Sequence, residues 1–280
     1  MSNTIVSPQE SLHLNELVLL ASAADRRTLC EQMALRVASS LLNDFALRAG
    51  SRLYRLAEIE FYFTTPPEAH HDDPFTHCDE LQNHLGYWYF HRTGSGYKGG
   101  SYKGLDVSLG QGGGAGGLLI RGLRSMHDGE LISGPSLCVD RLLVDCGHDS
   151  VAELVDALQS VHCRSTPTER GALLLAGLSV SDAHSPLRLI PLRTGATDVD
   201  GSLMLLAPEP VYRSPRVGLY LTKKKVPAQQ QADFFARAYR FVLYPWLLPK
   251  GRSLLAAQLY LDGENAERIQ QIISSSSSSS

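Results

Sequence analysis

The stretch RLYRLAEIEFYF, residues 52–63, decides the fold of this 280-residue chain because apolar and polar side chains alternate along it. Successive side chains of a β-strand point to opposite faces, and aromatic and β-branched residues favour strands. The buried face of this strand receives Ile59, Phe61 and Phe63. The other face carries Glu58, Glu60 and Tyr62, and two carboxylates on a strand built for burial require an explanation. The alternatives are a solvent-facing polar side and a carboxylate that activates water.

Helices and further strands are predicted on both sides of this strand. Apolar residues recur at helical spacing in residues 25–45 and 150–161, and a further helix is predicted to begin within residues 137–144. Strand patterns occur at residues 87–92, 118–124, 217–222 and 239–243. Because strands and helices do not alternate as in βαβ units, the sequence predicts an α+β fold. We expect a single domain around a curved, largely antiparallel β-sheet, a partly open barrel, with packed helices.

The expected domain occupies residues 26–262. It follows a loose leader at residues 1–25 and precedes a C-terminal segment, residues 263–280, that ends in a disordered serine tail. A glycine-rich insertion is expected at residues 94–117, as a flexible basic loop or a disordered surface insertion. Its glycines match neither a phosphate loop nor a dinucleotide-binding fingerprint, so nucleotide binding of either kind is not expected.

Composition bounds the compartment. With 43% hydrophobic and 20% charged residues, the chain has no apolar run of the roughly 18 residues that a membrane-spanning helix needs. Five scattered cysteines without CxxC pairing are typical of reduced thiols. We therefore expect an intracellular protein without a membrane partner: nuclear in a eukaryote, and otherwise in the cytoplasm or nucleoid.

Charge is unevenly distributed behind a net charge of -3. Residues 92–124 hold five basic residues against one acidic residue, a balance of +4, and residues 212–252 hold nine against one, a balance of +8. Residues 58–80 hold seven acidic residues and no Lys or Arg. If folding joins the two basic segments, they form a positive surface suited to phosphates; the alternative is a solvated face. The expected nucleic-acid contacts are Tyr97, Lys98, Tyr102, Lys103, Arg213, Arg216, Lys223 and Arg240.

Histidines gather next to the acidic residues. Five of the ten lie within 22 residues: His70, His71, His77, His84 and His91. A metal-dependent hydrolase with ligands at His70, His71, Asp73 and His77 is one interpretation. Because no HxxxH pair on a helix and no paired cysteines support that interpretation, we expect no metal and no cofactor.

Taken in order, several segments resemble the alkyladenine (3-methyladenine) DNA glycosylases. LAEIEFY is similar to that family's E-x-E-x-Y strand, and DDPFTH is similar to its D-x-x-[ST]-H loop. GYWYFH, LLIRGL, SGPSLC, SPRVGL and YRFVLYPW resemble later segments, so the match covers about residues 33–246. The resemblance implies an enzyme that flips a damaged purine, alkylated or deaminated, out of double-stranded DNA. The enzyme then hydrolyses the N-glycosidic bond without a covalent intermediate.

The resemblance also implies roles for individual residues. Glu60 would be the general base that aims water at the anomeric carbon, and Arg121 would hold that water. The base-binding residues would be Tyr62, His77, Tyr89, His91 and Asp106, and Leu247 would offer a backbone carbonyl to the water. We expect Glu60, Tyr62, His77 and Arg121 to converge on one cleft.

Two departures from the family pattern affect the expected substrate. The sequence CDELQNH, residues 78–84, replaces a basic stretch, and its acidic residues would weaken phosphate contact. Asp106 stands near a family asparagine, and an anion there favours cationic or donor-bearing bases. The alternatives are a non-catalytic nucleic-acid-binding relative on the same scaffold and a nucleoside or small-glycoside hydrolase. For each of these functions we expect a monomer.

Overall fold

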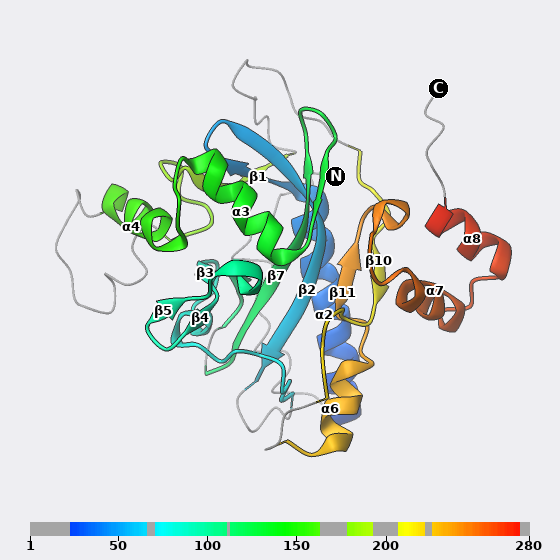
Figure 1. Cartoon of the computed structure of the whole chain (residues 1–280). Helices are drawn as coiled ribbons and strands as arrows, with labels where there is room; N and C mark the ends of the chain where they lie inside the picture. Colours follow the sequence, from blue (N-terminus) through cyan, green and yellow to red (C-terminus); the bar gives the residue numbers. More distant parts are fainter. Residues whose placement is uncertain are drawn as a thin grey trace, which may run out of the picture.

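The computed structural model describes residues 23–65, 71–110, 113–162, 178–192, 207–221 and 226–274. Most of the expected leader, His70, Lys223 and most of the serine tail lie outside these ranges. The described part is a mixed α+β domain around one large antiparallel sheet that is not closed (Figure 1). The predicted fold class is therefore confirmed.

Two long strands form the centre of the sheet. These are β2 (Arg52–Thr64) and β7 (Ala115–Ser125), which pair antiparallel along almost their whole length. The strand order is β10-β11-β2-β7-β6-β3, with β1 beside β2, β9 beside β1 and β8 beside β7. The shorter strands are β1 (Phe45–Ala49), β3 (Trp88–Phe90), β6 (Leu105–Ser108), β8 (Leu131–Ser133), β9 (Leu187–Pro191), β10 (Tyr212–Ser214) and β11 (Arg240–Val242). A separate ribbon pairs β4 (Arg92–Thr93) with β5 (Gly96–Tyr97).

The helices pack against this sheet. The long helix α2 (Ala23–Asp44) runs behind β2 in Figure 1, and α3 (Pro135–Cys146) lies in front of β7. Ile59, Phe61 and Phe63 are at most 1% exposed and share a core with Met33 and Leu41 of α2. The remaining helices are α4 (Val151–His162), α6 (Ala228–Phe235), α7 (Arg252–Leu261) and α8 (Ala266–Ser274). Short 3-10 turns are η3 (Glu80–Asn83), η4 (Gly100–Tyr102) and η5 (Pro245–Leu247).

The glycine-rich segment lies at the surface in its first part: residues 94–103 are exposed or half-buried, whereas its later strand residues belong to the sheet. It contains β6, whose residues are buried, and the first residues of β7. A Cβ added at Gly117 would lie 2.7 Å from the Asp106 side chain on β6, so glycine allows the two strands to approach closely. Gly117 therefore serves packing within the sheet, whereas a Cβ at Gly94, Gly99 or Gly100 would meet open space.

Two further expectations are corrected. Residues 217–221 form no strand, because Pro215 has no N–H to continue the ladder of β10 and the next residues turn into the site described below. The C-terminal segment is part of the fold as far as Ser274. Ile272 of α8 packs in a small cluster with Leu255 and Leu259 of α7. Within the described ranges, no helix has the length and apolar character to cross a membrane.

Candidate active site

The polar face of β2 carries a charge-balanced network. Arg121 Nε of β7 lies 3.1 Å from Glu58 Oε1 and 3.3 Å from Glu60 Oε1. Arg240 Nε of β11 donates to Glu58 Oε1 at 2.7 Å. Burial by itself would lower the pKa of Arg121, but the two carboxylates outweigh burial and raise it. Two carboxylates and two guanidiniums compensate each other, and this compensation permits such charges in the interior.

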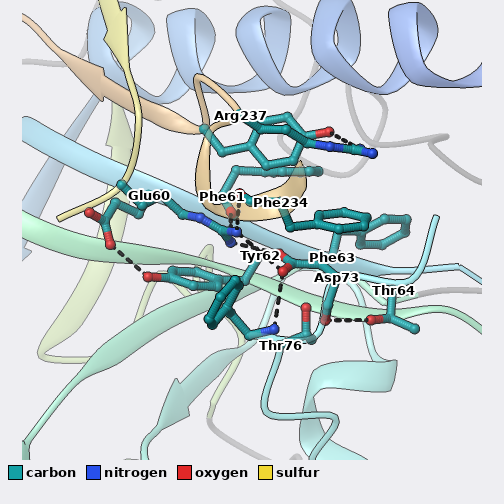
Figure 2. A network of polar contacts seen from close by, with 12 residues as sticks. Glu60, Phe61, Tyr62, Phe63, Thr64, Asp73, Thr76, Phe234 and Arg237 are labelled. Carbon is teal, nitrogen blue, oxygen red and sulfur yellow. Dashed lines mark hydrogen bonds and ion pairs between the residues drawn. The ribbon is translucent and has the colours of Figure 1, made fainter. Parts of the chain in front are cut away.

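Glu60 lies at the centre of this network and is fully buried. Its Oε1 accepts the backbone N–H of Val217 at 2.7 Å, and its Oε2 accepts the Tyr62 hydroxyl at 2.7 Å (Figure 2). Burial and the neighbouring Glu60 carboxylate raise the pKa of Tyr62 well above its ordinary value, so Tyr62 remains a donor. The Val217 N–H therefore fixes the position of this carboxylate, and the expected role of the Leu247 carbonyl toward the water stays a prediction.

A pocket of about 270 Å³ lies on the other side of Tyr62. Its polar lining consists of Tyr62, His77, Gln82, His91, Asp106 and Tyr220, and its apolar lining includes Phe75, Leu119 and Leu219. The expected convergence is thus partly wrong, because Glu60 and Arg121 do not line the pocket. They lie behind it, and the Tyr62 hydroxyl connects Glu60 to the pocket wall. Concave apolar walls with a few convergent polar groups are typical of ligand sites.

A buried ion pair holds two walls of this pocket together. Arg216 Nη1 and Nη2 donate to the two Asp73 oxygens at 2.6 and 3.2 Å, and both side chains are 0% exposed. The same guanidinium donates to the backbone carbonyls of Phe61 and Phe234. It also lies over the Tyr62 ring, 4.4 Å from its centroid. A ligand in the pocket can therefore stack only on the opposite face of Tyr62.

The remaining polar lining forms a second set of contacts. His91 Nε2 lies 2.8 Å from Asp106 Oδ1, and the Gln82 amide donates to Asp106 Oδ2 at 2.9 Å. His77 meets the His91 ring edge-on at 4.3 Å. Tyr89 is buried and does not line the pocket; its hydroxyl lies 3.4 Å from His77 Nδ1. Tyr89 and His91 were both expected to bind the base, and the structure places His91 in the pocket lining and the Tyr89 hydroxyl next to His77.

Two residues expected to contact nucleic acid cannot do so. Arg216 and Arg240 are each 1% exposed and are held by Asp73 and Glu58, so their assignment to the surface is wrong. A basic segment in the sequence does not reveal that its arginines are needed inside to balance the carboxylates of β2.

The other expected contacts are mostly paired. Lys103 pairs with Asp140, and Arg213 pairs with Asp262. Lys98 Nζ lies 3.3 Å from His77 Nε2, beside the pocket. Tyr97 packs edge-on against the Phe90 ring, whereas Tyr102 is 79% exposed.

The acidic residues near the pocket are partly neutralised. Asp79 caps the η3 turn and receives two hydrogen bonds from Arg92, at 3.1 and 2.6 Å. These bonds from Arg92 and a hydrogen bond from the Leu81 backbone lower the pKa of Asp79 even though burial opposes them. Glu80 keeps a side chain that is 70% exposed. One of the two acids thus turns toward an internal partner and the other faces solvent.

His71 serves the core. Its Nδ1 lies 2.9 Å from the Phe63 carbonyl, and its Nε2 lies 2.8 Å from the Tyr239 hydroxyl. These partners fit a neutral ring that donates from Nδ1 and accepts at Nε2. Asp73, a second expected ligand, is bound to Arg216. In the part of the chain that the structure describes, no three His, Cys, Asp or Glu side chains are grouped to hold a metal ion.

The buried His71 ring predicts a loss of stability in mild acid. Burial, with the nearby Arg237 charge, lowers the pKa of His71 from 6.5 to about 4. As pH falls from 6.5 to about 4, His71 becomes protonated in the unfolded chain but stays neutral in the folded chain. The His71 contribution, roughly 3 kcal/mol from a shift of this size, is present above pH 6.5 and lost toward pH 4. In urea unfolding across this range, His71→Gln should show a shallower decline than the wild type; equal slopes would refute the assignment.

Sequence reasoning missed several of the residues that shape this site. Asp73 was considered as a metal ligand and Arg216 as a phosphate contact, yet they bind each other. Gln82 received no role, although it holds Asp106 in place. The signal that the sequence offered was Asp73 in the DDPFTH segment, an acidic residue next to apolar positions. Its partner, Arg216, lies 143 residues away along the chain, so the pairing could not be predicted.

Comparison with known proteins finds a relative in a virus. An uncharacterized protein of Acanthamoeba polyphaga mimivirus is 32% identical over 202 residues. The alignment covers 63% of this chain and 91% of the viral protein. No protein-family model matches the chain. Because the viral protein is uncharacterized, this match identifies a relative and leaves the reaction to be inferred from the site.

Proposed function

We propose that this chain, which belongs to the same family as the uncharacterized mimivirus protein, is a monofunctional DNA N-glycosylase. It would hydrolyse the N-glycosidic bond of a damaged purine flipped out of double-stranded DNA. The observation that carries the proposal is the Glu60 carboxylate, buried and charge-compensated, directly behind the Tyr62 wall of a base-sized pocket. The proposed partner places the protein where DNA is, in a nucleus or nucleoid, and we propose that it acts as a monomer.

Glu60 supports this reaction through its charge. Breaking the glycosidic bond develops positive charge on the sugar, and a nearby carboxylate stabilises that charge. Arg121 Nε lies 3.3 Å from Glu60 Oε1, and this guanidinium compensates the carboxylate in its buried setting.

Tyr62 would connect this anion to the attacking water. Its hydroxyl donates to Glu60 and its ring lines the pocket. As water attacks the anomeric carbon, Tyr62 accepts a proton from the water and passes its own proton to Glu60. The electrons of the broken bond leave with the base, and a base that is already cationic leaves as a neutral molecule. Among the described residues that line the pocket there is no lysine to form a Schiff base, and strand cleavage is not part of the proposal.

The burial or pairing of several basic side chains favours a second candidate, a nucleoside hydrolase. Arg216 and Arg240 are buried, while Lys103 and Arg213 are paired with acids. Fewer free cations remain to hold a phosphate backbone than the sequence indicated, and a small glycoside would not need them.

Substrate size separates the two candidates. We expect release of base from duplexes that carry 3-methyladenine, hypoxanthine or ethenoadenine, with little release from the matching free nucleosides. Release from DNA should weaken steeply as salt rises, because binding to phosphates displaces counterions. Free base would be quantified by mass spectrometry. Release from nucleosides alone would select the second candidate, and release from neither would refute both.

A further inference from the structure

We infer that Asp106 selects the ligand of the pocket. A base binds when the edge that faces Asp106 is cationic or donates hydrogen bonds, and a base that offers only acceptors to Asp106 binds weakly. The inference deepens the proposed function, on which the identity of the ligand as a purine rests. It concerns this chain's own residues, and binding alone can test it.

Asp106 is held rigidly at the pocket. It lies on β6, between Tyr89 of β3 and Leu119 of β7, and is 2% exposed. Gln82 and His91 each contact one of its oxygens, at 2.9 and 2.8 Å. At Gly117 the chain leaves the space that the carboxylate fills. A side chain fixed from three sides presents its charge in one direction and pays little entropy when a ligand binds.

Among the described residues, no cationic side chain lines the pocket next to this carboxylate. The lining that the structure describes contains no Lys or Arg. Arg121 is engaged by Glu58 and Glu60, and Arg216 by Asp73. Lys98 Nζ lies 3.3 Å from His77 Nε2. The described lining therefore places the Asp106 carboxylate beside apolar walls, where electrostatic interactions are stronger than in water.

The remaining lone pairs define what this charge can bind. Each carboxylate oxygen can accept more than one hydrogen bond, so the contacts from Gln82 and His91 leave capacity for a ligand. An N–H that reaches Asp106 makes a charge-assisted hydrogen bond, whereas a ring nitrogen or carbonyl lone pair is repelled. The volume of about 270 Å³ lies just below the usual range for ligand pockets and suits a single base.

The test measures binding of two modified nucleosides by calorimetry. 1-Methyladenosine is cationic at neutral pH, whereas ethenoadenosine is neutral, and both are adenine derivatives. The wild-type protein should bind 1-methyladenosine at least about ten-fold more tightly, the effect of one hydrogen bond to a charged group. Asp106→Asn should reduce this ratio to near unity. Asp140→Asn, which removes a carboxylate that pairs with Lys103 at the surface, is the control and should preserve the ratio.

A second variant guards against misfolding. Gly117→Ala places a Cβ where the Asp106 carboxylate lies, 2.7 Å from Oδ2, and should also reduce the ratio although the charge remains. An unchanged ratio in Asp106→Asn protein with a wild-type melting temperature would overturn the inference. The absence of measurable binding by either nucleoside to the wild type would also overturn it.

The outcomes separate this inference from the proposed function. A wild-type preference for 1-methyladenosine that depends on Asp106, with no base released from any duplex, would refute the glycosylase and leave the selectivity standing. Base release from duplexes, with the same nucleoside selectivity in wild-type and Asp106→Asn protein, would support the glycosylase and refute the inference about Asp106.

Discussion

Glu60→Gln is expected to lower single-turnover base release by about 10³-fold, within the range typical of general acid–base groups. The substitution keeps an acceptor for the Val217 N–H but removes the negative charge that Glu60 carries behind Tyr62. It also ends the acceptance of a proton from Tyr62. Duplex binding should remain within a few-fold of wild type, because Glu60 is buried and touches no solvent-facing surface.

Glu80→Gln is the matched control for this prediction. Its side chain is 70% exposed and belongs to no part of the Glu60 network, so base release should be unchanged. If Glu60→Gln protein retained more than a tenth of the wild-type rate while the control behaved normally, Glu60 would not be the general base. Retained turnover together with wild-type stability would direct attention to another group in the pocket.

Asp73→Asn is expected to lower the free energy of unfolding by about 3–5 kcal/mol, the usual effect of removing one partner from a buried ion pair. The variant leaves the Arg216 guanidinium charged and fully enclosed. The same guanidinium lies over Tyr62 and precedes the Val217 N–H that binds Glu60. We therefore expect a disturbed pocket as well as a less stable protein.

Asp262→Asn is the appropriate comparison, because Arg213 and Asp262 form the same kind of pair at the surface, with side chains 39% and 30% exposed. Surface pairs contribute about 0–1 kcal/mol, so this variant should unfold near the wild-type urea midpoint. Equal losses of unfolding free energy in the two variants would mean that Asp73 and Arg216 do not form the buried ion pair described above.

The sequence predicted the central strand well because alternation is a local property. Residues 52–63 match β2, and the separation of Phe61 from Glu60 onto opposite faces is as expected. The strand predicted at residues 217–222 was wrong, although its apolar spacing resembles that of a strand. Pro215 ends the pairing of β10, and the contacts of Arg216 with Asp73 and of the Val217 N–H with Glu60 fix the path of the chain that follows. These contacts join residues that are far apart in the chain, so a local sequence pattern does not reveal them.

The candidate site was predictable in part. Glu60, Tyr62 and Arg121 were expected together, and they lie in mutual contact. Their depth was not predictable, because a sequence does not show that Tyr62 covers Glu60. Charge totals misled for a similar reason: Arg240 counts as basic in a segment, but it compensates Glu58 inside the sheet.

The most direct test of the central claim is mass-spectrometric measurement of free bases released from alkylated duplex DNA. Wild-type and Glu60→Gln proteins would be compared at equal concentration, and abasic sites counted in the same samples. We expect the wild-type protein to release modified purines in amounts equal to the abasic sites formed, without strand breaks, and the variant to release almost none. Equal release by both proteins, or none above the protein-free sample, would contradict the account.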